Sequence, residues 1–118
     1  MIPLTKPFFD EQELNAVKQT LESGWVAGQG PKSKEFEKKF SEYIRVKHGV
    51  AVNNCTAALH LALLCLEIKP GDEVIVSDYT FPATGHAVKY CGAKPVFCDI
   101  NKRTYNLDPE KLEKLITS

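Results

Sequence analysis

The chain has 118 residues, 43% hydrophobic and 25% charged, which is an ordinary composition for a folded globular domain or part of one. Fifteen basic and fifteen acidic side chains give a formal net charge of zero. The sequence also has no basic run with interleaved aromatic residues, so we exclude nucleic acid and anionic membrane surfaces as partners.

The first 47 residues predict two helices and no strand. One helix is expected from Asp10 to Ser23, because apolar residues recur at helical spacing there and Gly24 is suited to end it. A glycine-containing link over residues 25–30 follows, and Pro31 fits the first position of a second helix. We therefore expect residues 1–47 to form an N-terminal helical segment.

From residue 48 onward, short apolar runs alternate with helical patterns. Strands are expected at 50–52, 73–76 and 96–100, and helices at 56–67, 82–91 and after an Asp108 cap with Pro109 first. Residues Lys69–Asp72 have Pro and Gly at the central positions of a type II turn. This alternation predicts an α/β fold with a mostly parallel sheet, in which residues 48–118 form successive βαβ units, βαβαβα in order.

Targeting and cysteine patterns favour a cytoplasmic protein without disulfides or metal. The N-terminus has two prolines and no long apolar core, and the longest apolar stretch, 57–66, is about half of a bilayer span. The four cysteines show no C-x-x-C spacing, and the three histidines do not interleave with them at ligand spacing. We expect Cys65 and Cys91 to be buried structural thiols, since both lie in apolar helical patterns.

The segment from Val52 to Leu59 is the best candidate for a binding site. A buried strand is expected to end there, small polar residues turn the chain, and an apolar helix begins. Such a junction directs free backbone N–H groups and the positive end of a helix at one point, which suits a phosphate. The alternative is that Asn54 or Thr56 is only a helix cap. The absence of a G-x-G-x-x-G or Walker pattern disfavours dinucleotides and nucleoside triphosphates.

A second segment, Ser77–Thr84, follows the next predicted strand. It lies at the carboxyl end of that strand, where α/β folds place their ligands. An aromatic side chain in this segment could face a planar cofactor ring. Alternatively, Tyr79 and Phe81 could simply cover the core.

Together, these segments resemble the DegT/DnrJ/StrS family of sugar aminotransferases, which use pyridoxal 5′-phosphate. The resemblance covers nearly the whole chain and rests on the order and spacing of several modest motifs: Ser23–Pro31, Asn54–Leu63, Pro70–Val76, Thr80–Thr84, Gly92–Phe97 and Tyr105–Pro109. It implies the large domain of the aspartate-aminotransferase type, that is, fold type I, in a homodimer with active sites at the interface.

The resemblance also implies roles for particular residues. Thr56 and Ala57 are expected to bind the cofactor phosphate, largely through backbone amides, with Cys55 beside them and Phe81 stacked on the pyridine ring. Trp25 and Gly28 are expected near the active-site entrance, where substrate binds. The chain departs from the family at Asn54–Cys55, where the family has Ser followed by Gly or Ser, and at Ala27, which replaces a hydroxyl residue.

The implied reaction transfers an amino group, commonly from glutamate, to a nucleotide-linked keto sugar of the kind used in polysaccharide biosynthesis. In this family the cofactor-anchoring lysine lies beyond the segment matched here, and Lys89 and Lys94 are interpreted as surface residues. We therefore assign no catalytic residue to this chain and expect an N-terminal fragment that is inactive alone. Two alternatives are a sugar dehydratase of the same family and a non-catalytic α/β binding module.

Overall fold

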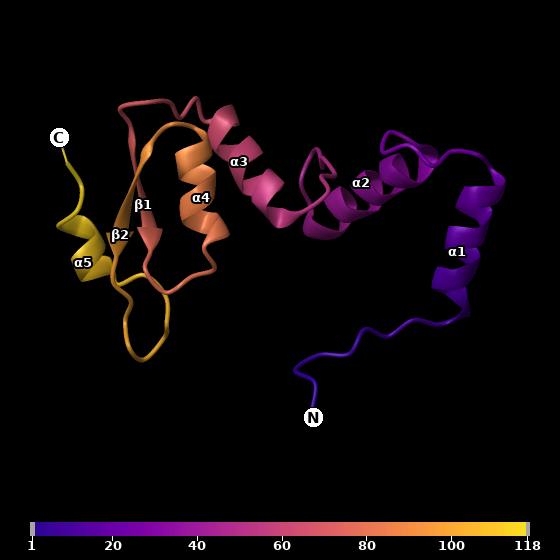
Figure 1. The fold of residues 1–118 in the computed structure, drawn as a ribbon, viewed down its shortest axis with the longest axis horizontal. Coiled ribbons are helices and arrows are strands. Elements are labelled where there is room, and N and C mark those ends of the chain that lie inside the picture. The colour runs from indigo at the N-terminus through magenta and orange to yellow at the C-terminus, as the bar shows by residue number, and fades with distance from the viewer. Residues whose placement is uncertain (1, 118) are drawn as a thin grey trace. The chain divides into compact units, whose positions relative to one another are not determined.

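The computed structural model describes residues 2–117, which form two compact units. Unit 1 is Met1–Ala51 and unit 2 is Val52–Ser118. Figure 1 labels the helices and strands of both units, which are described separately below. Within the described residues, no helix is long and apolar enough to cross a membrane.

Unit 1 contains two helices that begin where local capping chemistry predicts. Helix α1 (Glu11–Glu22) starts after Asp10, whose carboxylate accepts the Gln12 N–H at 2.7 Å. The Glu13 carboxylate accepts the Asp10 N–H at 2.8 Å, which completes a capping box. Helix α2 (Pro31–Ile44) begins with Pro31, as expected. Both predicted helices of this segment are confirmed.

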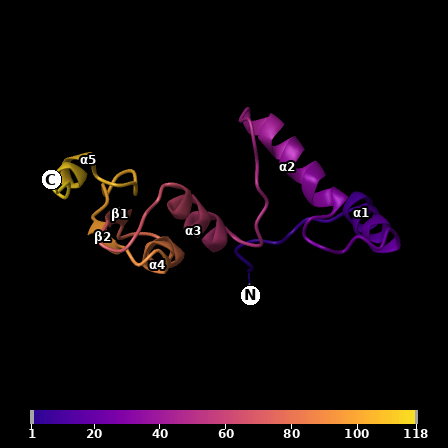
Figure 2. The same ribbon diagram turned by 90° about the horizontal axis from the view of Figure 1, so that it is seen from above.

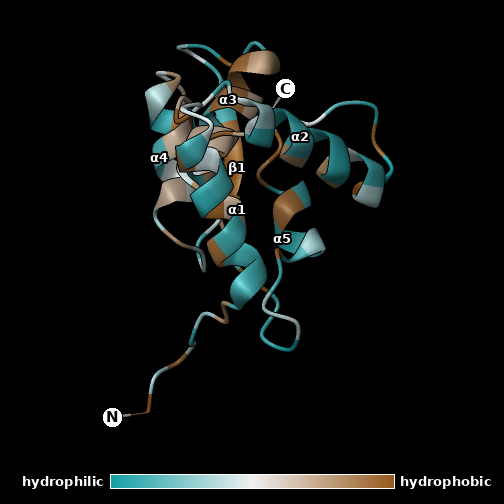
Figure 3. Cartoon of the chain, turned by 90° about the vertical axis from the view of Figure 1, so that its right-hand side faces the viewer, coloured by the Kyte–Doolittle hydropathy of each residue, from teal (hydrophilic) through white to brown (hydrophobic). Residues whose placement is uncertain are grey.

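One exposed face of α2 carries ion pairs between residues three and four apart in the helix. Lys39 Nζ lies 2.7 Å from one Glu35 carboxylate oxygen, and Lys32 Nζ lies 3.0 Å from the other. The hydrogen bond from Lys39 and then that from Lys32 lower the pKa of Glu35 to about 2. All three side chains are exposed, so the ion pairs belong to a solvated helix face, which Figure 3 shows as largely hydrophilic.

Unit 2 is an α/β unit built on a two-stranded parallel sheet. Its elements in order are α3 (Cys55–Cys65), β1 (Glu73–Ser77), α4 (Ala83–Tyr90), β2 (Lys94–Cys98) and α5 (Pro109–Glu113). The strands pair in register from Glu73↔Lys94 to Ser77↔Cys98. Helix α4 connects them, which makes β1–α4–β2 the expected parallel crossover, with α3 packed beside α4 (Figures 1 and 2).

The hydrophobic core of unit 2 lies between α4 and the sheet. Val76 of β1 and Val88 of α4 are 5% and 1% exposed, and Cys91 and Ala93 complete the buried cluster. Leu63 of α3 and Ile68 pack against its margin. Cys91 is buried as predicted, but the prediction for Cys65 is wrong, because α3 has no buried residue and this thiol is exposed.

The strand predicted at residues 50–52 is absent from the structure. A strand needs a hydrogen-bonded neighbour, and both described strands pair with each other. The Ala51 N–H instead donates to the Glu37 carboxylate at 2.8 Å. Residues 52–117 therefore follow the order αβαβα in place of the predicted βαβαβα.

Two predicted local structures of unit 2 are confirmed, a turn before β1 and the start of α5. The Asp72 N–H donates to the Lys69 carbonyl at 3.1 Å, and Gly71 has φ +102°, as a type II turn requires. Helix α5 begins at Pro109, and the Asp108 carboxylate accepts the Glu110 N–H at 3.1 Å.

Candidate functional site

The first turn of α3 presents backbone donors in the manner expected of an anion site. The Asn54 side chain accepts the Ala57 N–H at 2.8 Å, and the Asn54 carbonyl accepts the Ala58 N–H at 3.2 Å. Among residues 2–117, the Cys55 and Thr56 amides have no hydrogen-bond acceptor. This turn contains no acidic residue, so the positive end of the helix dipole is not neutralised there.

This geometry confirms the cap interpretation of Asn54. Of the two amides predicted to bind phosphate, that of Thr56 is available and that of Ala57 is engaged by Asn54, while the neighbouring Cys55 amide is also available. Cys55 is exposed, while Thr56 and Ala57 are partly exposed. Two free amides, a neighbouring Thr56 hydroxyl and the helix N-terminus are suited to the oxygens of a phosphate ester. The residues present therefore fit the phosphate group of pyridoxal phosphate.

Phe81 lies in the connection from β1 to α4. Its carbonyl accepts the Thr84 N–H at 3.1 Å, and the Thr80 and Thr84 hydroxyls lie 3.0 Å apart, so the backbone of this connection is anchored to the first turn of α4. The Phe81 side chain is 79% exposed. Its ring is thus held on an ordered turn and is open to a planar group.

The edge at which β1 and β2 end, at Ser77 and Cys98, is called the carboxyl edge below. The Asp78 N–H donates to the Cys98 carbonyl at 3.0 Å, which ties the two strand ends together. A hollow of about 430 Å³ opens beside this edge, lined by residues of the β1–α4 connection, by Gly85, His86 and Lys89 of α4, and by Pro95 and Phe97 of β2. The Ser77–Thr84 segment therefore occupies the edge at which parallel sheets bind ligands.

The carboxyl edge also contains residues to which the sequence assigned no role in a site. Tyr105 brings its ring to 5.8 Å from that of Tyr79, between ring centroids, and has a φ of +58°. Lys111 forms an ion pair with Asp99, and its hydrogen bond lowers the pKa of Asp99. The sequence carried only a weak signal for this arrangement, the turn-forming residues Asn101 and Asn106, whose backbones pair at 2.9 Å.

Trp25 and Gly28 lie in unit 1, whereas the four cofactor candidates lie in unit 2. Trp25 is 56% exposed, and its backbone N–H donates to the Ser23 hydroxyl at 3.2 Å. A Cβ on Gly28 would meet no atom within 4 Å. The substrate-binding role of both residues stays a prediction.

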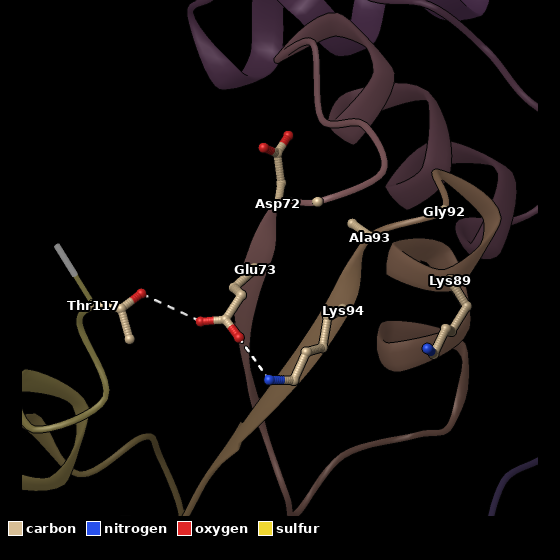
Figure 4. Close-up of a pocket in the computed structure, with 8 residues that line it drawn as sticks. Asp72, Glu73, Lys89, Gly92, Ala93, Lys94 and Thr117 are labelled. Carbon is tan, nitrogen blue, oxygen red and sulfur yellow. Dashed lines mark hydrogen bonds and ion pairs between the residues drawn. The ribbon is translucent and has the colours of Figure 1, made fainter.

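A second hollow in unit 2, about 670 Å³, lies at the opposite edge of the sheet, where the strands begin (Figure 4). Lys94 Nζ lies 2.7 Å from one Glu73 oxygen, and the Thr117 hydroxyl donates to the other at 3.3 Å. The Lys94 hydrogen bond lowers the pKa of Glu73. Both carboxylates of this hollow are already engaged, since Asp72 also accepts the Lys69 N–H at 2.9 Å, so the carboxyl edge is the better candidate site.

The fold defines a protein of the α/β class, and the α3 turn is a candidate anion site at a helix N-terminus. Comparison with known families identifies the kind of α/β protein: the model of the DegT/DnrJ/EryC1/StrS aminotransferase family matches residues 7–118. The chain belongs to this family of pyridoxal-phosphate-dependent aminotransferases.

Individual relatives agree with this assignment. The chain is 49% identical over 116 residues to the spore coat polysaccharide biosynthesis protein SpsC of Bacillus subtilis, covering 98% of this chain and 30% of the relative. It is 47% identical to a GDP-perosamine synthase of Caulobacter vibrioides, with 98% and 31% covered. A putative sugar aminotransferase of Streptococcus pneumoniae, solved in its PLP form, superposes with a TM-score of 0.93 at 43% identity, over 98% of this chain and 29% of that structure.

The sequence-based assignments of family, fold type and cofactor are therefore confirmed. The chain spans about 30% of the length of the curated relatives it matches.

Proposed function

We propose that this chain provides the phosphate-binding part of a pyridoxal-phosphate aminotransferase that acts on a nucleotide-linked keto sugar. The observation that carries the proposal is the pair of free amides at the start of α3, in a chain that belongs to this family. The relative named GDP-perosamine synthase supports a sugar joined to a nucleotide. Glutamate as amino donor, homodimeric assembly and cytoplasmic location remain part of the same proposal.

The residues of this chain have binding and orienting roles in the proposal. The Cys55 and Thr56 amides, the Thr56 hydroxyl and the Ala57 amide hold the phosphate, while the Phe81 ring stacks on the pyridine ring. Trp25 and Gly28 contribute to substrate binding at the entrance. The cofactor, when bound, supplies the electron sink for the reaction. Because no lysine here matches the family's anchoring lysine, the chain by itself catalyses no amino transfer.

A pair of substitutions at Cys55 tests the phosphate site. Proline at this first helical position fits helix geometry but lacks the N–H, and Asn54 already has the extended backbone that a following proline requires. Cys55→Ala keeps the amide and serves as the matched control. We expect Cys55→Pro to weaken binding of pyridoxine 5′-phosphate by about tenfold, since one charge-assisted hydrogen bond is lost.

Pyridoxine 5′-phosphate is a suitable probe because it has the ring and the phosphate but no aldehyde to react with surface lysines. Titration monitored by amide NMR should shift the Cys55, Thr56 and Ala57 resonances together with the ring protons of Phe81. If the ligand shifts other residues and leaves these unchanged, or if Cys55→Pro binds as well as Cys55→Ala, the phosphate site proposed here is wrong.

A further inference from the structure

The side chain of Asn54 and the cofactor phosphate require the same donor. Asn54 Oδ1 accepts the Ala57 N–H at 2.8 Å, and this amide is one of the donors assigned to the phosphate above. A single N–H donates one strong hydrogen bond, so the two acceptors cannot both have it at full strength. The family resemblance predicted the phosphate contact, and the structure adds the competing one.

We propose that Asn54 is a displaceable cap of the phosphate site. Its side chain holds the Ala57 N–H while the site is empty, releases it when the phosphate binds, and takes it back when the phosphate leaves. The inference rests on the proposed function, because it requires a phosphate at the start of α3. It assigns Asn54 a role in setting cofactor affinity, as a positioning residue and not a catalytic one.

The surroundings of Asn54 allow this exchange without loss of the helix start. The Asn54 carbonyl accepts the Ala58 N–H at 3.2 Å, a backbone contact that does not involve the side chain. Asn54 is exposed and has an extended backbone, with φ −164° and ψ 166°. Within residues 2–117, its side chain makes only the hydrogen bond to Ala57. Rotation of one side chain therefore frees the amide.

Charge determines which acceptor prevails. The amide oxygen of Asn54 is neutral, whereas a phosphate ester carries up to two negative charges and forms shorter, stronger hydrogen bonds with backbone N–H groups. The positive end of α3 adds to this preference. The phosphate thus displaces the Asn54 side chain. Because the Asn54–Ala57 hydrogen bond must be broken, the phosphate binds more weakly than it would if the Ala57 N–H were free.

Thermodynamic linkage predicts the direction in which removal of the Asn54 side chain changes the affinity for phosphate. Asn54→Ala raises the free energy of the empty state by the loss of its cap, while a bound state that does not use the side chain is unchanged. Fraying of the helix start in the empty variant can reduce this difference but cannot reverse it, because the frayed state is equally accessible to the unaltered chain. Loss of a typical cap corresponds to binding that is about fivefold tighter.

The test measures the dissociation constant of pyridoxine 5′-phosphate by calorimetry and that of inorganic phosphate by amide NMR, using the complete 118-residue chain. We expect Asn54→Ala to bind both about fivefold more tightly, although its helix start is less stable. Asn54→Asp should bind about tenfold more weakly, because a carboxylate holds the amide more strongly and repels the phosphate. Asp10→Ala is the matched control: it removes the cap of α1, where Asp10 accepts the Gln12 N–H, and should leave both constants unchanged.

The outcomes separate this inference from the proposed function. If the unaltered chain binds neither ligand at the first turn of α3, the phosphate site fails and the displaceable cap fails with it. If the chain binds and Asn54→Ala binds more weakly, the Asn54 side chain contacts the phosphate directly and the inference is overturned. If Asn54→Ala binds with unchanged affinity, the phosphate does not use the Ala57 amide. This result would also overturn the displaceable cap, but it would leave the proposed phosphate site in place.

Discussion

Gly92 fixes the end of α4 against the turn before β1, and its replacement by alanine tests the packing of unit 2. The Gly92 N–H donates to the Lys89 carbonyl at 2.9 Å and the Ala93 N–H to the Val88 carbonyl at 3.2 Å, so the residue closes α4 with φ +75°. A Cβ added to Gly92 would lie 2.8 Å from Pro70 Cγ. Gly92→Ala therefore meets both a backbone penalty and a steric one.

The two penalties can be estimated separately. An L-residue in the left-handed region costs about 1–2 kcal/mol relative to glycine. The contact with Pro70 is about 0.7 Å shorter than a normal carbon–carbon separation, and a proline ring cannot rotate away from it. Overpacking of this kind costs about 1–3 kcal/mol. We therefore expect Gly92→Ala to lower the free energy of unfolding of unit 2 by about 2–5 kcal/mol.

Gly71→Ala provides the control within the same unit. Gly71 has φ +102°, but a Cβ there would meet no atom within 4 Å, so only the backbone penalty applies. Urea unfolding followed by far-ultraviolet circular dichroism compares the two variants, with hydrogen exchange of the Lys94 amide, which donates to the Asp72 carbonyl at 2.9 Å, as a local measure. Equal destabilisation by the two substitutions would show that Pro70 does not limit the space at Gly92.

Two further predictions concern the core and the charged face of α2. Val88→Ala should destabilise unit 2 by about 2 kcal/mol, because two methyl groups are lost from a side chain that is 1% exposed; a loss below about 0.5 kcal/mol in urea unfolding would contradict this packing. The Glu35 pKa, about 2 against an ordinary 4.5, predicts a small stabilisation of unit 1 that is complete above pH 4.5 and lost as pH falls toward 2. Lys39→Gln should raise this pKa in a carbon-13 NMR titration, and an unchanged value would show that Lys39 does not pair with Glu35 in solution.

Local chemistry accounts for the parts of the fold that the sequence predicted correctly. Asp10 and Asp108 cap helices, Pro31 begins one, and Gly71 allows a type II turn; each acts through atoms within three residues along the chain. The wrong predictions depended on distant partners. The strand at 50–52 lacks a neighbouring strand, and the Cys65 thiol lacks a covering element, and neither condition could be determined from local spacing.

The candidate site was likewise predictable from the sequence only where it depends on residues that are close together in the chain. The α3 turn was predictable because a strand-like run, small polar residues and an apolar helix follow one another in the sequence. The Tyr79–Tyr105 and Asp99–Lys111 pairs were not, since they join segments 26 and 12 residues apart. The first pair depends on the parallel arrangement of β1 and β2, and the second on the antiparallel bridge that joins Ile100 to Leu107. The competition between Asn54 and phosphate for one N–H became apparent only with the hydrogen bond itself.

Helix α3, which presents the proposed phosphate site, is itself poorly covered, and this leads to a last prediction. Helix α3 is strongly apolar, yet its Leu61 and Leu64 are 41% and 48% exposed, and Leu66, which follows the helix as its C-cap, is 71% exposed. Exposed apolar surface of this kind favours contact with further apolar surface. We therefore expect the chain to self-associate as its concentration rises, and expect Leu64→Gln to reduce this in light scattering.

Leu14→Gln on α1 is a useful comparison, because Leu14 is 63% exposed but lies on a helix whose other face is charged and polar. If α3 dominates self-association, Leu64→Gln reduces it much more than Leu14→Gln does. A chain that stays monomeric at high concentration and melts in one sharp transition would contradict the expectation. In that case the surface of α3 is already covered in solution, and the access of phosphate to its first turn would need to be measured before the cofactor site is accepted.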